Sequence, residues 1–375
     1  MAARSKIVQT LVDQIHQQDD WESMFQAAVA DCISQAPVYM EKYSIRTLND
    51  YFDYMDTLLT WIPSEIVTAT QLLERVRVFY FLFQQEAVRS LQTEISPETT
   101  HVPLSWMSNW LVSYARSLGE FLDTPASLTS ESLATFFACP KHNLNDYIIP
   151  EGGWNTFNEF FARRVRPECR PIANPEDPTV IVSPADSAYQ DSWPIDDQDG
   201  TVTFKGISWR ISDLLQDSIF KDEFRGGTFV HSLLFPWDYH RMHSPLDGVV
   251  LEARVINGQA MLEAIAVEGR PKSNRDKEEG YQWCQTRGLV VLDTQIGKVA
   301  ILPVGMGHIS SVQLSVETGQ KLRKGDELAF FQYGGSDIAL VFEKASQASI
   351  SAVEDPQHPM ARYMVGEKIG VSERH

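Results

Sequence analysis

The stretch GLVVLDTQIGKVAILP, residues 288–303, decides the fold expected for this chain. It holds two apolar runs, Gly288–Leu292 and Lys298–Pro303, which are bounded by glycine and proline. Short runs that are rich in Val, Ile and Leu and that end at turn-forming residues are typical of β-strands. The stretch therefore predicts two strands of a β-rich region.

Similar runs recur on both sides of this stretch. They are Thr201–Phe204, Gly227–Leu234, Gly248–Val255, Ala260–Val267, Ile309–Ser315, Leu328–Tyr333 and Ile338–Phe342. Short strands at this spacing predict a core that closes as a barrel or a sandwich. We expect the charged segment 273–280 to be a mobile loop and the tail after Asp355 to be partly loose.

The chain up to about Leu144 has a different pattern. Apolar residues recur there at helical spacing, as at Ile7, Leu11 and Ile15. The segment 140–153, which is rich in proline and glycine, is typical of a linker. We therefore predict an α+β fold, with a helical N-terminal domain over residues 1–150 and a β-rich domain over residues 151–375.

Composition excludes several classes of protein. The formal net charge is -18, which opposes binding to nucleic acid and to anionic lipid. The four cysteines form no CxxC pair, so neither a disulfide framework nor a metal site is expected. The N-terminus lacks a signal-peptide pattern, and the apolar run Val76–Phe83 is too short to span a bilayer. We expect a cytoplasmic protein without an integral membrane segment.

Four arginines cluster in one stretch: Arg163, Arg164, Arg166 and Arg170. Charge clusters of this kind usually form a solvated or ion-paired face. We interpret this cluster in the same way.

A serine after two glycines is the first candidate for chemistry. Gly334, Gly335, Ser336 and Asp337 lie between two predicted strands. Glycine permits backbone conformations that other residues resist, and strain there could bring the Ser336 hydroxyl onto the Gly335 carbonyl. The alternative is an ordinary hairpin turn.

Two further patches supply acid–base groups. His240 and His243 are three residues apart, and an imidazole can accept a serine proton or deliver a proton to a carbanion. Asp186 can orient a histidine and stabilise its cation. Each also has a structural alternative, because turn-capping aspartates and structural histidines are common.

Taken in order, several motifs resemble the phosphatidylserine decarboxylase family. They are Phe157-Asn158-Glu159-Phe160-Phe161-Ala162-Arg163, Arg170-Pro171-Ile172, Ser183-Pro184-Ala185-Asp186, His240-Arg241-Met242-His243-Ser244-Pro245 with Gly248, and Gly334-Gly335-Ser336. The resemblance covers roughly residues 150 to 345 and makes the β-rich region the catalytic domain. It departs from the family's usual motifs at Ser187, where a glycine is common, and at Asp337, where a threonine is common.

The resemblance implies a self-made cofactor. Ser336 attacks the preceding carbonyl, the chain is cut between Gly335 and Ser336, and the new N-terminus becomes a pyruvoyl group. Asp186 and His243 match the positions that activate the serine, and His240 matches the histidine assigned to protonation. The pyruvoyl group then acts as an electron sink through a Schiff base with the substrate amine. The cut chain would keep its own small chain as a partner, and the family suggests a homodimer.

Three functions remain open. The helical N-terminal region and the motifs resemble a soluble branch that includes fungal tryptophan decarboxylases, which implies a free amino acid, preferably aromatic, as the substrate. The alternative is phosphatidylserine, with Val76–Phe83 or Trp106–Trp110 as a lipid-facing patch unless these stretches form helix core. A third reading is a non-catalytic carrier, because the segment from Val316 to Phe342, with Lys324, resembles barrel-sandwich domains. We expect Asp337 to place a carboxylate beside the pyruvoyl site.

Overall fold

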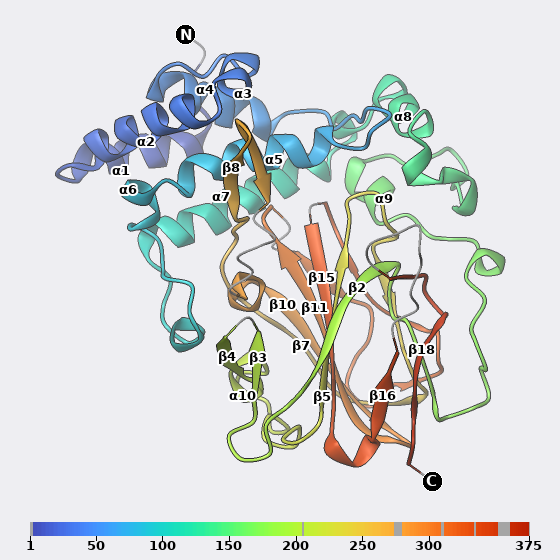
Figure 1. The fold of residues 1–375 in the computed structure, drawn as a ribbon. Coiled ribbons are helices and arrows are strands. Elements are labelled where there is room, and N and C mark those ends of the chain that lie inside the picture. The colour runs from blue at the N-terminus through green and yellow to red at the C-terminus, as the bar shows by residue number, and fades with distance from the viewer. Residues whose placement is uncertain are drawn as a thin grey trace.

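Helices fill the first part of the chain and strands fill the second (Figure 1). The computed structural model describes residues 3–204, 206–273, 280–308, 311–333, 335–351 and 361–374. The α-helices are α1 (Lys6–Gln17), α2 (Trp21–Gln35), α3 (Pro37–Lys42), α4 (Leu48–Leu59), α5 (Gln71–Phe83), α6 (Glu86–Arg89), α7 (Trp106–Leu122), α8 (Ser130–Phe137), α9 (Phe157–Phe161) and α10 (Ile211–Leu214). The strands are β1 (Val180–Val182), β2 (Ser187–Pro194), β3 (Thr201–Phe204), β4 (Ile207–Arg210), β5 (Thr228–Leu234), β6 (Arg241–His243), β7 (Gly248–Ile256), β8 (Ala264–Val267), β9 (Arg270–Ser273), β10 (Arg287–Thr294), β11 (Gly297–Met306), β12 (Val312–Leu314), β13 (Lys321–Leu322), β14 (Glu327–Phe331), β15 (Gly335–Phe342), β16 (Ala348–Ile350), β17 (Arg362–Tyr363) and β18 (Lys368–Ser372).

One large sheet organises the second part of the chain. Its eight strands follow the order β13-β7-β10-β11-β15-β5-β2-β17, and each neighbouring pair is antiparallel. The sheet curls as a half-barrel, and the helical layer covers the end at which β15 begins (Figure 1). The predicted α+β class is therefore confirmed.

The two faces of this sheet belong to two apolar clusters. Along β15, Ile338 and Leu340 pack into the larger cluster, which also contains the buried side chains of the helical region. Ala339 and Val341 pack into a second cluster around Trp283. Successive side chains of a strand point to opposite faces, so both faces of β15 are buried, and the strand reads as one continuous apolar run.

Aromatic side chains join the helices to the sheet. The rings of Phe79 on α5 and Tyr114 on α7 stack with their centroids 4.5 Å apart. His308, which follows β11, packs with its ring centroid 4.8 Å from that of Phe79. The larger apolar cluster runs from Val8 to Ile369 and thus crosses residue 150. The division into two domains at that point stays a prediction.

The predicted strands agree with the structure, with some corrections. β15 begins at Gly335 rather than Ile338, because pairing with strands on both sides outweighs the weak strand preference of Gly, Ser and Asp. In the tail after Asp355, which was expected to be partly loose, β17 and β18 pair with β2 and β1, and residues 356–360 lie outside the described residues. Residues 274–279 of the expected mobile loop, and the start of Ile309–Ser315, lie outside the described residues.

No helix in the described ranges combines the length and the apolar character that crossing a bilayer requires. The run Val76–Phe83 lies within α5. Seven of its eight side chains are buried, Arg77 being the exception. This run therefore forms helix core.

Burial of His308 predicts a loss of stability in acid. Its ring nitrogens have no hydrogen-bond partner among the described residues, and burial lowers its pKa from 6.5 to about 3. Below pH 6.5 the unfolded chain binds a proton that the folded chain does not, so each pH unit costs about 1.4 kcal/mol of stability until the pH approaches 3. We expect His308→Phe to reduce the pH slope of urea unfolding, measured from pH 7.5 to pH 5, by this amount. His142, His240 and His243 keep their own contributions, because burial lowers their pKa values too.

The matched control is Phe79→Leu, which disturbs the same packing but keeps the imidazole. It should lower the free energy of unfolding by a similar amount at every pH. If His308→Phe shows the same pH slope as the parent, His308 is not the group responsible.

Candidate active site

Ser336 is the second residue of β15 and lies inside the sheet rather than in a turn. It pairs with Gly305 on β11 and with Leu234 on β5. Its side chain is fully buried, and Oγ has no hydrogen-bond partner among the described residues. A buried hydroxyl without a partner costs about 1–3 kcal/mol. Because Oγ makes no hydrogen bond with the described residues, it is available to react with the neighbouring Gly335 carbonyl. Gly334 lies outside the described residues.

Asp337 points to the opposite face of β15. Strand alternation places its side chain on the face of Ala339 and Val341. There Oδ2 lies 2.8 Å from Nε2 of His231, and both side chains are buried. The structure thus places this carboxylate behind Ser336, and not beside the reactive group as the sequence suggested.

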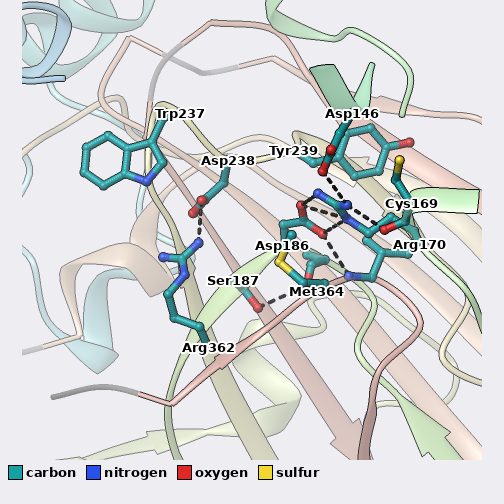
Figure 2. Close-up of polar contacts among 12 residues, drawn as sticks. Asp146, Cys169, Arg170, Asp186, Ser187, Trp237, Asp238, Tyr239, Arg362 and Met364 are labelled. Carbon is teal, nitrogen blue, oxygen red and sulfur yellow. Dashed lines mark hydrogen bonds and ion pairs between the residues drawn. The ribbon is translucent and has the colours of Figure 1, made fainter. Parts of the chain in front are cut away.

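Asp186 directly precedes β2 and is held by an arginine (Figure 2). Its Oδ1 accepts from Nε of Arg170 at 2.9 Å, and its Oδ2 accepts from Nη2 at 2.6 Å. The backbone N–H of Val365 also donates to Oδ1, at 2.8 Å. Burial alone would lower the pKa of Arg170, but hydrogen bonds to Asp186 and Asp146 raise it above its ordinary value. Asp186 was expected from the sequence to orient a histidine; in the described part of the chain its carboxylate accepts from Arg170 and from the Val365 N–H instead.

His243 lies at the end of β6, beside the segment that carries Asp186. Its backbone N–H donates to the carbonyl of Pro184 at 2.8 Å. Nδ1 lies 2.7 Å from the carbonyl oxygen of Gly325, which can only accept, so Nδ1 carries the proton. Nε2 lies 3.0 Å from the hydroxyl of Tyr239 and therefore accepts. Burial lowers the pKa of His243, although the hydrogen bond with the Gly325 carbonyl raises it. The ring is thus neutral at pH 7, with Nε2 as the basic atom.

His240 is fully buried against an aromatic ring. Its ring centroid lies 4.0 Å from that of Phe161, and neither ring nitrogen has a hydrogen-bond partner within the described ranges. Burial lowers its pKa well below the ordinary value, and the positive charge of Arg163 lowers it further. Tyr333 also packs on Phe161, with centroids 5.6 Å apart. His240 is therefore a neutral imidazole close to the segment that leads into β15.

Strand register gathers the four predicted residues at the end of the sheet that faces the helices. β15 and β2 both pair with β5, so Ser336 and the residue after Asp186 are two strands apart. This separates their backbones by roughly 10 Å. His240 and His243 follow the end of β5. No hydrogen bond in the described part of the chain joins any two of these four side chains.

The arginine cluster is divided between surface and interior. Arg164 and Arg166 are exposed, as the interpretation of a solvated face requires. Arg163 and Arg170 are buried, and Arg163 lies with its guanidinium carbon 4.1 Å from the ring centroid of Tyr147. Arg170 is ion-paired with Asp146 and Asp186, as one form of the interpretation allows. Neither Arg163 nor Arg170 belongs to an exposed face, however, because spacing alone does not show which side chains a fold turns inward.

A pocket of about 420 Å³ opens beside Asp186. Its walls include Tyr147, Phe235, Trp237, Asp238, Arg362 and Met364. Figure 2 shows Trp237, Asp238 and Arg362 on one side, and Asp186 with Arg170 on the other. Phe235 follows Leu234, the residue that pairs with Ser336, so the pocket lies at the same end of the sheet as the serine.

The pocket combines aromatic faces with charges. The rings of Phe235 and Trp237 stack with centroids 4.8 Å apart and planes 6° apart. Nζ of Lys141 lies 4.4 Å from the centroid of Trp237. Burial raises the pKa of Asp238 to about 7, although its partner Arg362 lowers it. A ligand with an aromatic body and an ionised head would match these walls.

Comparisons with known proteins agree with the motif order. The phosphatidylserine decarboxylase family model matches residues 157–371, more than half of the chain. A relative from Schizosaccharomyces pombe, named phosphatidylserine decarboxylase proenzyme 3, is 33% identical over 59% of this chain and 22% of its own length. Decarboxylase iboD of Amanita muscaria is 32% identical over 56% of this chain and 65% of its own length. The Clostridium novyi phosphatidylserine decarboxylase proenzyme is 28% identical over 68% of this chain and 84% of its own length.

The matched region thus spans less than two thirds of the yeast and Amanita proteins. The family model and these matches show that the chain is related to decarboxylases. The chain belongs to the phosphatidylserine decarboxylase family, whose members use a self-derived pyruvoyl group.

Proposed function

We propose that this chain is a pyruvoyl-dependent decarboxylase that matures by cutting its own backbone between Gly335 and Ser336. The observation that carries the proposal is the buried Oγ of Ser336, which lies at the start of a central strand and has no hydrogen-bond partner among the described residues. Oγ attacks the carbonyl carbon of Gly335, and the C–N bond breaks as an ester forms. Loss of the Ser336 α-proton expels the Gly335 carboxylate, and hydrolysis then releases ammonia and leaves the pyruvoyl group.

His243 and Asp186 serve the first step. Nε2 of His243 is the basic atom and can take the Oγ proton, directly or through the hydroxyl of Tyr239. The negative charge of Asp186 favours the cationic form of His243. Arg170 holds that carboxylate in place, so Asp186 acts on the histidine through its charge rather than through a hydrogen bond.

His240 serves the later step. The pyruvoyl group supplies a conjugated carbonyl that takes up the electron pair left behind when CO2 departs. His240 is desolvated and neutral, and the charge of an incoming substrate carboxylate favours its protonation. It can then deliver this proton to the substrate carbon. Its burial against Phe161 limits access of water to the same place.

A free amino acid, preferably an aromatic one such as tryptophan, is the substrate we propose. The pocket beside Asp186 is large enough for such a molecule and offers the stacked rings of Phe235 and Trp237 to its side chain. Of the stretches considered for lipid contact, Val76–Phe83 is helix core and supports this choice. Within Trp106–Trp110, Met107 and Trp110 are buried and Trp106 is 37% exposed. We also propose a cytoplasmic location, retention of the small chain after cutting, and a homodimer.

Phosphatidylserine is the second candidate substrate. Ile148 and Ile149 are 44% and 53% exposed and directly follow Tyr147, a wall of the pocket. Two exposed isoleucines beside a polar pocket could rest on a membrane surface. A carrier function has less support. Lys324, in the tight turn that such a function would use, is buried, and its Nζ donates to the carbonyls of Asn174 and Asp177.

Three substitutions separate the two steps. Ser336→Ala and His243→Ala should give an uncut chain without activity, because the nucleophile or its base is missing. His240→Ala should still cut but lose about 100-fold or more in kcat, the typical contribution of a general acid. Cutting is read on a denaturing gel and turnover as CO2 release. His16→Ala, at an exposed position on α1, is the control. A His240→Ala protein that turns over normally would remove His240 from the mechanism.

The substrate is tested with tryptophan and with phosphatidylserine vesicles. We expect CO2 from tryptophan and none from the vesicles. Trp237→Ala should raise KM for tryptophan about fivefold, since a lost aromatic contact costs about 1 kcal/mol, and Trp237→Phe should restore most of the affinity. Turnover of the vesicles that Ile148→Ser with Ile149→Ser abolishes would establish the lipid substrate instead.

A further inference from the structure

A buried histidine–aspartate pair lies directly behind the cleavage site. Nε2 of His231 on β5 is 2.8 Å from Oδ2 of Asp337 on β15, and the two side chains are 5% and 4% exposed. Within the sheet, Asp337 pairs with Leu233 and His231 pairs with Ala339, so the bond runs diagonally between the strands. The ring centroid of Trp283 lies 5.0 Å from that of His231 and closes this side.

The pair is an unusual choice for its surroundings. Its neighbours on this face are apolar, among them Phe229, Ala339 and Val341. Oδ1 of Asp337 has no partner among the described residues. A buried polar pair adds little stability compared with well-packed apolar side chains. Its position next to Ser336 therefore calls for a reason other than stability.

Cutting the backbone supplies that reason. Cleavage between Gly335 and Ser336 separates β15 from the chain that precedes it, so the reactive residue becomes the free end of a strand. Strand ends and chain termini open more readily than strand interiors. Asp337 is the first side chain after the cut, and its partner His231 belongs to the larger fragment.

On the basis of the proposed function, we propose that His231 and Asp337 form a clamp that keeps the cut end of β15 in register. The clamp joins the two fragments across β5 and β15, on the face of β15 opposite to the Ser336 side chain. It makes both residues positioning residues, because they touch neither the Ser336 side chain nor the pocket. The carboxylate of Asp337 can only accept a hydrogen bond, so Nε2 of His231 is the donor of the bond between them.

The test compares variants of the full-length, self-cut protein. Asp337→Ala should still cut, but kcat should fall about tenfold with KM little changed, and the small chain should leave the complex at a lower urea concentration. Asp337→Asn keeps an acceptor for Nε2 and should restore most of kcat and of small-chain retention. His231→Ala should match Asp337→Ala, and the double variant should be no worse than either, because the same contact is lost.

The control is Asp213→Ala, which breaks a more exposed pair with His101, 3.2 Å long. It should change neither kcat nor retention. If Asp337→Ala fails to cut, His231→Ala carries the comparison. Suppose that the parent protein is cut and active, and that the clamp variants keep its kcat and hold the small chain equally well. This result would contradict the clamp but not the proposed function. A parent that never cuts would overturn the proposed function, and the clamp with it.

Discussion

The pairing of β15 with a strand on each side is the constraint on which the rest of the site depends. Eight residues of β15 pair with β11, and seven of them pair with β5 as well. This pairing buries Ser336 and fixes the direction of its side chain, and it sends Asp337 to the other face. It also means that the proposed cut occurs within a folded sheet, so the reactive end inherits its position from contacts that exist before cleavage.

The sequence predicted nine of the 18 strands in the described part of the chain, and it predicted the order of the site motifs. Strands such as Gly288–Leu292 could be predicted because both of their faces are buried, which gives a continuous apolar run in the sequence. β2 was missed because the run Ser187–Pro194 is polar and only partly buried. β17 was missed because it is two residues long and depends on pairing with β2. The strand start at Gly335 was missed because its residues favour turns in the sequence, whereas pairing with neighbouring strands makes them part of β15.

The partners of the site residues were harder to predict than the residues themselves. The motifs singled out Asp186 and His243, but Asp186 is held by Arg170, from a cluster interpreted as a surface face. Tyr239, whose hydroxyl lies beside Nε2 of His243, directly precedes the quoted motif that begins at His240, and it was assigned no role from the sequence. Such contacts join positions far apart in the chain or depend on which way a side chain turns, and spacing carries no information on either. An account of the site therefore has to include Arg170 as the residue that fixes the charge near the histidine.

The most direct test of the central claim is the intact mass of the purified protein under denaturing conditions. The account predicts two chains, one ending at Gly335 and one beginning at position 336 and lighter than a serine-initiated chain by one ammonia. A single uncut chain of 375 residues that stays intact over days would contradict it.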